Sequence, residues 1–185
     1  MRRTIMALVA TMLALASADA AWAVTVTIGG LAGQCSTLAH DGRNDGDSRD
    51  ICTHALLNEF LDGHDLAGTY VNRGAMELGA RLNEAAHADF LKAIQIMPQM
   101  GEAHIGEGAY LVNEARFAEA EAEIDRGLAF GSEQPEKGYY LRGIARWGQD
   151  NFKGAYDDFQ HAIALKPTWS RPREELKNFH VDASR

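Results

Sequence analysis

A pattern of small and apolar residues recurs three times along this chain, and it limits the possible folds more than any other feature. Each copy has a glycine, followed 12 residues later by an alanine and 16 residues later by a large apolar residue. The glycines are Gly74, Gly108 and Gly143, so the period is 34 and then 35 residues. A fixed period of this length is typical of folds in which one supersecondary unit stacks on the next. Each copy carries two helix-period patterns separated by a short turn, which predicts an all-α fold.

The first and third copies agree with each other more closely than with the second. An alanine and a proline follow the glycine by 19 and 24 residues, as Ala93 and Pro98 in the first copy and as Ala162 and Pro167 in the third. Each proline is expected to end the second helix of its copy. In the second copy Gly127 replaces the alanine, and the turn after it has one extra residue.

The period and the residue types resemble those of the tetratricopeptide repeat (TPR) family over residues 67–167. The resemblance implies a TPR-like α-solenoid of three helix-pair repeats. We place the repeats at residues 67–100, 101–135 and 136–167.

The residues before the repeats, 24–66, are predicted to form a degenerate half-repeat. Residues 47–61 have a helical pattern, and residues 31–40 would be a shortened partner helix. Cys35 and Cys52 most simply form one disulfide in an oxidising compartment, and a closed loop of about 15 residues contributes about 3 kcal/mol in the chain-entropy model. The alternative, a redox or metal role, lacks a Cys-x-x-Cys motif. The arrangement resembles bacterial exported TPR proteins with two cysteines ahead of the repeats.

A C-terminal capping helix and tail are predicted at residues 168–185. A solenoid needs a terminal cap with a polar outer face, and residues 168–180 have an amphipathic pattern. Trp169, Leu176 and Phe179 would cover the third repeat.

The first residues have the pattern of a cleaved signal peptide, which we place at residues 1–23. Two arginines precede an apolar run at residues 5–16, which is shorter than the roughly 20 residues of a membrane span. Small residues favour cleavage after Ala23, with Ala20 as the second choice and an uncleaved anchor as the structural alternative. We therefore expect an exported, soluble, periplasmic bacterial protein, with no stable membrane span after cleavage.

The charge balance argues against one class of partner. The chain has 18 basic and 26 acidic residues, a formal net charge of −8, and no basic stripe. Binding to nucleic acid depends on Lys and Arg contacts to phosphates, so nucleic-acid binding is not expected.

Two groups of residues were weighed as ion or metal sites. The acidic segment 41–50 is similar to a calcium loop, but Arg43 stands at the third position and Cys52 at the twelfth, where a glutamate is needed. A solvated loop is the favoured interpretation. His54 and His64 lie ten residues apart with aspartates nearby, without a zinc-protease motif. We expect no cofactor and no catalytic residues, and we retain a metal-binding or small hydrolytic protein as the alternative.

Two Arg–Asp pairs recur at a spacing of 16 residues, Arg73 with Asp89 and Arg142 with Asp158. Each pair is predicted to link the two helices of its repeat by an ion pair of modest strength. In the second repeat both positions are acidic, Glu107 and Glu123, and Arg126 is the candidate partner.

Proteins of the TPR family bind ligands on the concave surface lined by the first helix of each repeat. The resemblance places twelve residues there, and helical spacing puts each set on one face. They are Val71, Asn72, Ala75 and Leu78; Ile105, Ala109, Val112 and Asn113; and Lys137, Tyr140, Ile144 and Trp147. We expect a non-enzymatic scaffold that holds an unidentified protein or peptide there, either transiently or within an envelope complex. The alternative is that these side chains pack against the chain's own ends.

Overall fold

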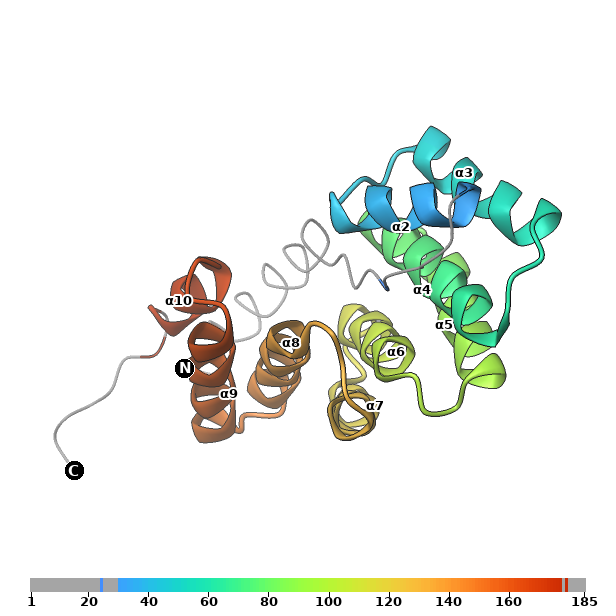
Figure 1. The fold of residues 1–185 in the computed structure, drawn as a ribbon. Coiled ribbons are helices and arrows are strands. Elements are labelled where there is room, and N and C mark those ends of the chain that lie inside the picture. The colour runs from blue at the N-terminus through green and yellow to red at the C-terminus, as the bar shows by residue number, and fades with distance from the viewer. Residues whose placement is uncertain (1–23, 25–29, 178, 180–185) are drawn as a thin grey trace, which may run out of the picture.

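The computed structural model describes Val24, residues 30–177 and Phe179. Over these residues the chain is all helical, as the periodicity predicts, and it contains no strand. The helices follow one another along an arc, with α2 and α3 at one end and α10 at the other (Figure 1). Their bounds are α2 Leu31–His40, α3 Gly46–Asn58, α4 Gly63–Gly79, α5 Asn83–Ile96, α6 Gly101–Asn113, α7 Phe117–Phe130, α8 Pro135–Gly148, α9 Phe152–Leu165 and α10 Arg171–Leu176.

The three sequence repeats correspond to three packed helix pairs, α4 with α5, α6 with α7 and α8 with α9. The two helices of a pair approach closely where the repeated glycine faces the repeated large side chain. A Cβ atom added to Gly74 would lie 2.9 Å from the ring of Phe90, and one added to Gly143 would lie 2.6 Å from the ring of Phe159. Both rings are fully buried. Glycine is therefore required at these positions by the closeness of the two helices.

The turn inside each helix pair has the same backbone geometry in all three repeats. One residue of each turn has a left-handed φ, 64° at Arg81, 56° at Ala115 and 61° at Asp150. None of the three is glycine, the residue that adopts this conformation most readily. The sequence pattern did not indicate these turns, because nothing in the residue types marks them.

The half-repeat is formed by α2 and α3, and the predicted disulfide joins them. Cys35 and Cys52 are both fully buried, and their Cα atoms are 4.9 Å apart. Helix α3 begins within the acidic segment that was expected to be a solvated loop. Asp45 caps the helix by accepting a hydrogen bond of 3.0 Å from the backbone N–H of Ser48. That bond, together with Arg43, lowers the pKa of the Asp45 carboxyl to about 2.

The closing helix α10 is shorter than predicted and lies within the expected range 168–180. Aromatic contacts hold the C-terminal segment against the third repeat. The Trp169 ring lies 4.9 Å from the Tyr140 ring, and the Phe179 ring lies 4.6 Å from the Trp147 ring, measured between centroids.

Two predictions fall largely on other parts of the chain. The expected signal peptide at residues 1–23 lies outside the described residues. Among the helices that the structure describes, none is both long enough and apolar enough to cross a membrane.

Candidate functional site

The twelve residues predicted to line the concave surface are mostly interior residues of the fold. Those that are buried are Val71, Asn72, Ala75, Leu78, Ile105, Ala109, Val112 and Tyr140. The remaining four, Asn113, Lys137, Ile144 and Trp147, are partly buried. The prediction therefore identified positions that pack within the array, and what covers each of them decides whether it is free to bind a partner.

At the third repeat, the cover is the chain's own C-terminal segment. Besides its contact with Trp169, the Tyr140 hydroxyl donates a hydrogen bond of 3.3 Å to Glu175 of α10. Burial raises the pKa of the Tyr140 phenol, and the nearby carboxylate of Glu175 raises it further. Trp147 packs against Phe179. These two aromatic residues, which the sequence offered as binding anchors, contact the end of the same chain.

At the second repeat, the neighbouring helices take up the predicted side chains. Ile105 points toward close approaches of α7 and α8, where added Cβ atoms at Gly127 and Gly138 would lie 2.6 and 3.1 Å from it. Asn113 differs, because its buried Oδ1 atom has no hydrogen-bond partner among the described residues.

At the first repeat, the cover is a single residue, Val24, which precedes α2 in the sequence. The Val24 N–H donates a hydrogen bond of 2.7 Å to Asn72 Oδ1, and Asn72 Nδ2 donates one of 3.0 Å to the Val24 carbonyl oxygen. The Ser36 hydroxyl of α2 donates a further bond of 2.7 Å to the same carbonyl. An N–H can only donate and a carbonyl can only accept, so these partners fix which way the Asn72 amide points.

The side chain of Val24 is 1% exposed and Asn72 is 0% exposed. Val24 belongs to an apolar cluster with Val71 of α4 and with Met100 and Ala103 at the start of α6. We refer to the space around Val24, bounded by Ser36, Asn72 and this cluster, as the Asn72 pocket. It recognises a peptide unit by hydrogen bonds and a small side chain by apolar contacts.

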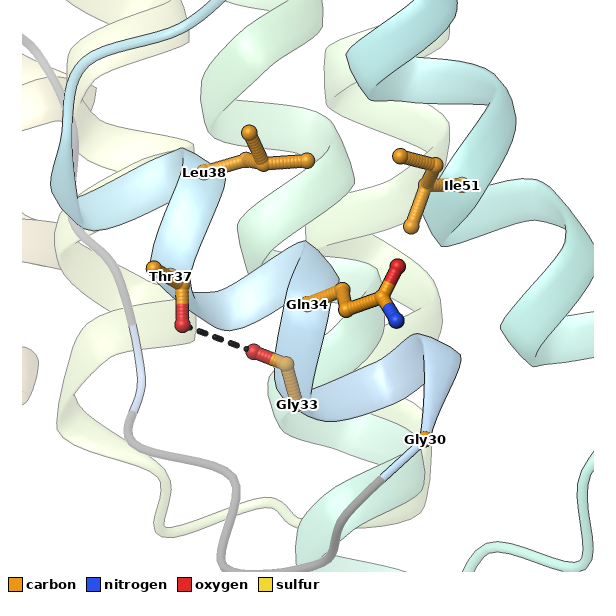
Figure 2. A pocket seen from close by; sticks show the side chains of 6 residues that line it. All are labelled: Gly30, Gly33, Gln34, Thr37, Leu38 and Ile51. Carbon is orange, nitrogen blue, oxygen red and sulfur yellow. Dashed lines mark hydrogen bonds between the residues drawn. The ribbon is translucent and has the colours of Figure 1, made fainter.

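A second hollow lies between α2 and α3 and was not anticipated from the sequence. It is open and has a volume of about 470 Å³. Figure 2 shows its lining and the hydrogen bond of 3.0 Å from the Thr37 hydroxyl to the Gly33 carbonyl oxygen. It is lined by Gly30, Gly33, Gln34, Thr37, Leu38 and Ile51. None of these side chains ionises, so the hollow supplies neither an acid–base group nor a charged ligand for a metal.

The residues weighed as metal ligands have structural partners. Asp62 caps α4 by accepting from the Asp65 N–H, and His64 lies 3.5 Å from Asp65. Asp45 of the acidic segment caps α3. Over residues 30–177, the structure brings together no group of three or more His, Cys, Asp or Glu side chains that could hold a metal ion.

Comparison with known proteins gives no relative for this chain. No protein-family model matches it, and neither a curated protein nor a solved structure does.

Proposed function

We propose that this protein is an exported, non-enzymatic TPR-like scaffold that binds an extended segment of a partner protein in the Asn72 pocket. The support for a TPR-like solenoid is that the three helix pairs coincide with the three sequence repeats. The support for export is the leader-like sequence at residues 1–23 and the disulfide between Cys35 and Cys52.

The observation that carries the proposal is the pairing of Asn72 with both backbone groups of one residue. Two hydrogen bonds to a backbone unit are independent of the side chain that the unit carries, so they give affinity for any extended segment. The apolar wall of the pocket then selects a small or β-branched residue, of which Val24 is the example.

The charge of the protein further limits the partner. With a net charge of −8, the scaffold disfavours the approach of strongly acidic segments over long range. The expected ligand is therefore an extended, apolar segment that carries neutral or basic flanking residues.

Site-specific photo-crosslinking in intact cells tests the proposal. A photoreactive side chain at Asn113 or Ile144, both partly buried on first helices of repeats, should crosslink to a partner peptide that mass spectrometry can identify. The same group at Lys153 of α9, whose side chain is 88% exposed, is the control and should not crosslink to that peptide. Asn72→Leu should abolish the specific crosslink, because leucine is the residue at the equivalent position of the third repeat, Leu141.

Two results would reject the proposal. One is equal crosslinking of the same peptide from Lys153 and from the inner positions. The other is an unchanged crosslink in a folded Asn72→Leu variant.

A further inference from the structure

We infer that the Asn72 pocket carries its own internal ligand, and that a partner segment must displace Val24 in order to bind. The inference rests on the proposed function and adds its regulation. It makes the N-terminal segment of the chain a competitor of the partner, so that the scaffold exists in a self-occupied state and an open state.

The geometry of Val24 is that of a bound peptide residue. Its N–H and its carbonyl oxygen both bond to side chains, Asn72 and Ser36, at 2.7 to 3.0 Å. Residues of a helix or sheet satisfy these groups with other backbone groups instead. Val24 is thus held by contacts that any extended segment of similar shape can reproduce.

The pocket exists because the half-repeat differs from a complete repeat. At the position equivalent to Asn72, the second repeat has Gly106, where an added Cβ would lie 2.5 Å from the ring of Phe90 in the preceding helix pair. In the first repeat the preceding pair is α2–α3, and the buried residue beside Asn72 is Val24. An inserted residue therefore occupies a place that a stacked helix fills in the next repeat.

An empty pocket is unfavourable, and this makes the two occupants mutually exclusive. Asn72 is fully buried, so loss of Val24 leaves both atoms of its amide without their partners. The open state is stabilised only when another peptide unit offers one donor and one acceptor in the same places. Because Val24 is tethered, its effective concentration at the pocket is on the order of millimolar, which lowers the apparent affinity of any competitor.

The test uses the full chain and a labelled synthetic peptide of residues 21–29 as the probe, with binding measured by fluorescence anisotropy. Val24→Asp places a charge in the apolar cluster and should eject the internal ligand, so the peptide should bind this variant at least tenfold more tightly than it binds the wild type. Ser36→Ala removes one of the three hydrogen bonds and should give a smaller gain, about threefold. Leu57→Asp, a change of the same kind at a 75% exposed residue of α3, is the control and should bind like the wild type.

The dependence on Asn72 separates specific binding from general stickiness. In the Val24→Asp background, Asn72→Leu should reduce peptide affinity by about tenfold or more. Should circular dichroism show that Val24→Asp loses helix, Val24→Gly replaces it, because glycine keeps both backbone bonds while losing the apolar contacts. Equal peptide binding by the wild type and by the folded variants overturns the inference.

The failure of the inference and that of the proposed function give different patterns. If the peptide ignores the opened variants while inner-face crosslinks to a partner persist, the internal ligand is wrong and the scaffold proposal stands. If the peptide binds the opened variants but no partner crosslinks, the pocket serves only the chain itself.

Discussion

The first and third repeats hold their two helices together by buried Arg–Asp pairs, whereas the second repeat has no such pair. Arg73 donates hydrogen bonds of 2.7 and 2.8 Å to Asp89, and Arg142 donates bonds of 3.0 and 2.7 Å to Asp158. Each pair is bidentate and links the first helix of its repeat to the second, as the common spacing of 16 residues predicted.

In the second repeat, histidines take the place of the arginines. His87 of α5 lies 2.7 Å from Glu107, and His104 of α6 lies 2.8 Å from Glu123. Arg126 contacts Glu123, as anticipated, but no sequence signal identified the two histidines as partners. The His87–Glu107 pair joins α5 to α6 and thus connects two repeats, whereas the Arg–Asp pairs act within a repeat.

The position four residues before the repeated glycine changes together with these pairs. Tyr70 and Tyr139 lie under the guanidinium groups of Arg73 and Arg142, at 5.7 and 5.2 Å from ring centroid to Cζ. His104 occupies this position in the second repeat, and its second ring nitrogen lies 2.9 Å from the carbonyl oxygen of Pro98. The comparison teaches that a conserved backbone arrangement accommodates two different polar solutions, provided that tyrosine, arginine and aspartate change together.

The largest expected effect is the loss of the carboxylate in the third repeat. Asp158 is 2% exposed and bonds to both Arg142 and Arg146, so Asp158→Ala leaves two partly buried cations without it. We expect a loss of about 3–5 kcal/mol in the free energy of unfolding by urea. Asp157→Ala, an adjacent and more exposed carboxylate, is the control and should cost less than about 1 kcal/mol. Equal losses would show that the buried pair does not distinguish the third repeat.

The second prediction concerns the glycine that replaces an alanine in the second repeat. An added Cβ at Gly127 would lie 2.7 Å from the backbone oxygen of Gly101 and 2.6 Å from Ile105. Gly127→Ala should therefore cost about 1–3 kcal/mol, although alanine is the normal residue at this position in the other two repeats. Gly63→Ala in α4, with no atom within 4 Å of its added Cβ, should instead leave stability unchanged or raise it by up to about 1 kcal/mol. A harmless Gly127→Ala would mean that the second repeat tolerates the spacing of the others.

The third prediction uses the residue three positions after the repeated glycine, which is Glu77, Leu111 and Arg146 in the three repeats. Burial, and then the charge of Asp89, raise the pKa of Glu77 to about 7. The folded state therefore keeps a proton that the unfolded state releases near pH 4.5, and the free energy of unfolding should fall as the pH rises from 4.5 to 7.

The glutamine variant isolates this effect from other titrating groups. Glu77→Gln cannot ionise, so its stability relative to the wild type should increase by about 1–3 kcal/mol between pH 4.5 and pH 7. Leu111→Gln is not a suitable control because it would add a buried polar group, whereas Glu84→Gln changes an exposed glutamate on α5. A constant difference between Glu77→Gln and the wild type across this range would contradict the prediction.

The fold was more predictable than the site, and the reason is physical. Close packing of two helices demands a small residue opposite a large one at a fixed spacing, so Gly74 with Phe90 and Gly143 with Phe159 are visible in the sequence. Helical periodicity also indicates which residues share a face. It does not indicate what covers that face.

The site depended on contacts between segments far apart in the sequence. Nothing near Val24 marks it as a ligand of Asn72, 48 residues away, and nothing near Glu175 marks it as a partner of Tyr140. The disulfide was the exception, because two cysteines in the described half-repeat leave a single intramolecular pairing. Long-range, single-residue contacts leave no periodic trace, so the structure was needed to find them.

The smallest effect concerns a feature that the three repeats share. Ala115 holds a φ of 56° in the turn of the second repeat, a conformation that alanine adopts at a cost of about 1 kcal/mol and glycine adopts freely. Ala115→Gly should therefore raise the free energy of unfolding by up to about 1 kcal/mol, after the greater flexibility of glycine in the unfolded chain offsets part of the relief. Ala118→Gly, an exposed position inside α7, should lower it by a similar amount. Opposite signs for two identical substitutions three residues apart would show that the turn geometry is constrained independently of the polar pairs, whereas a loss at both positions would show that the second repeat does not share the turn of its neighbours.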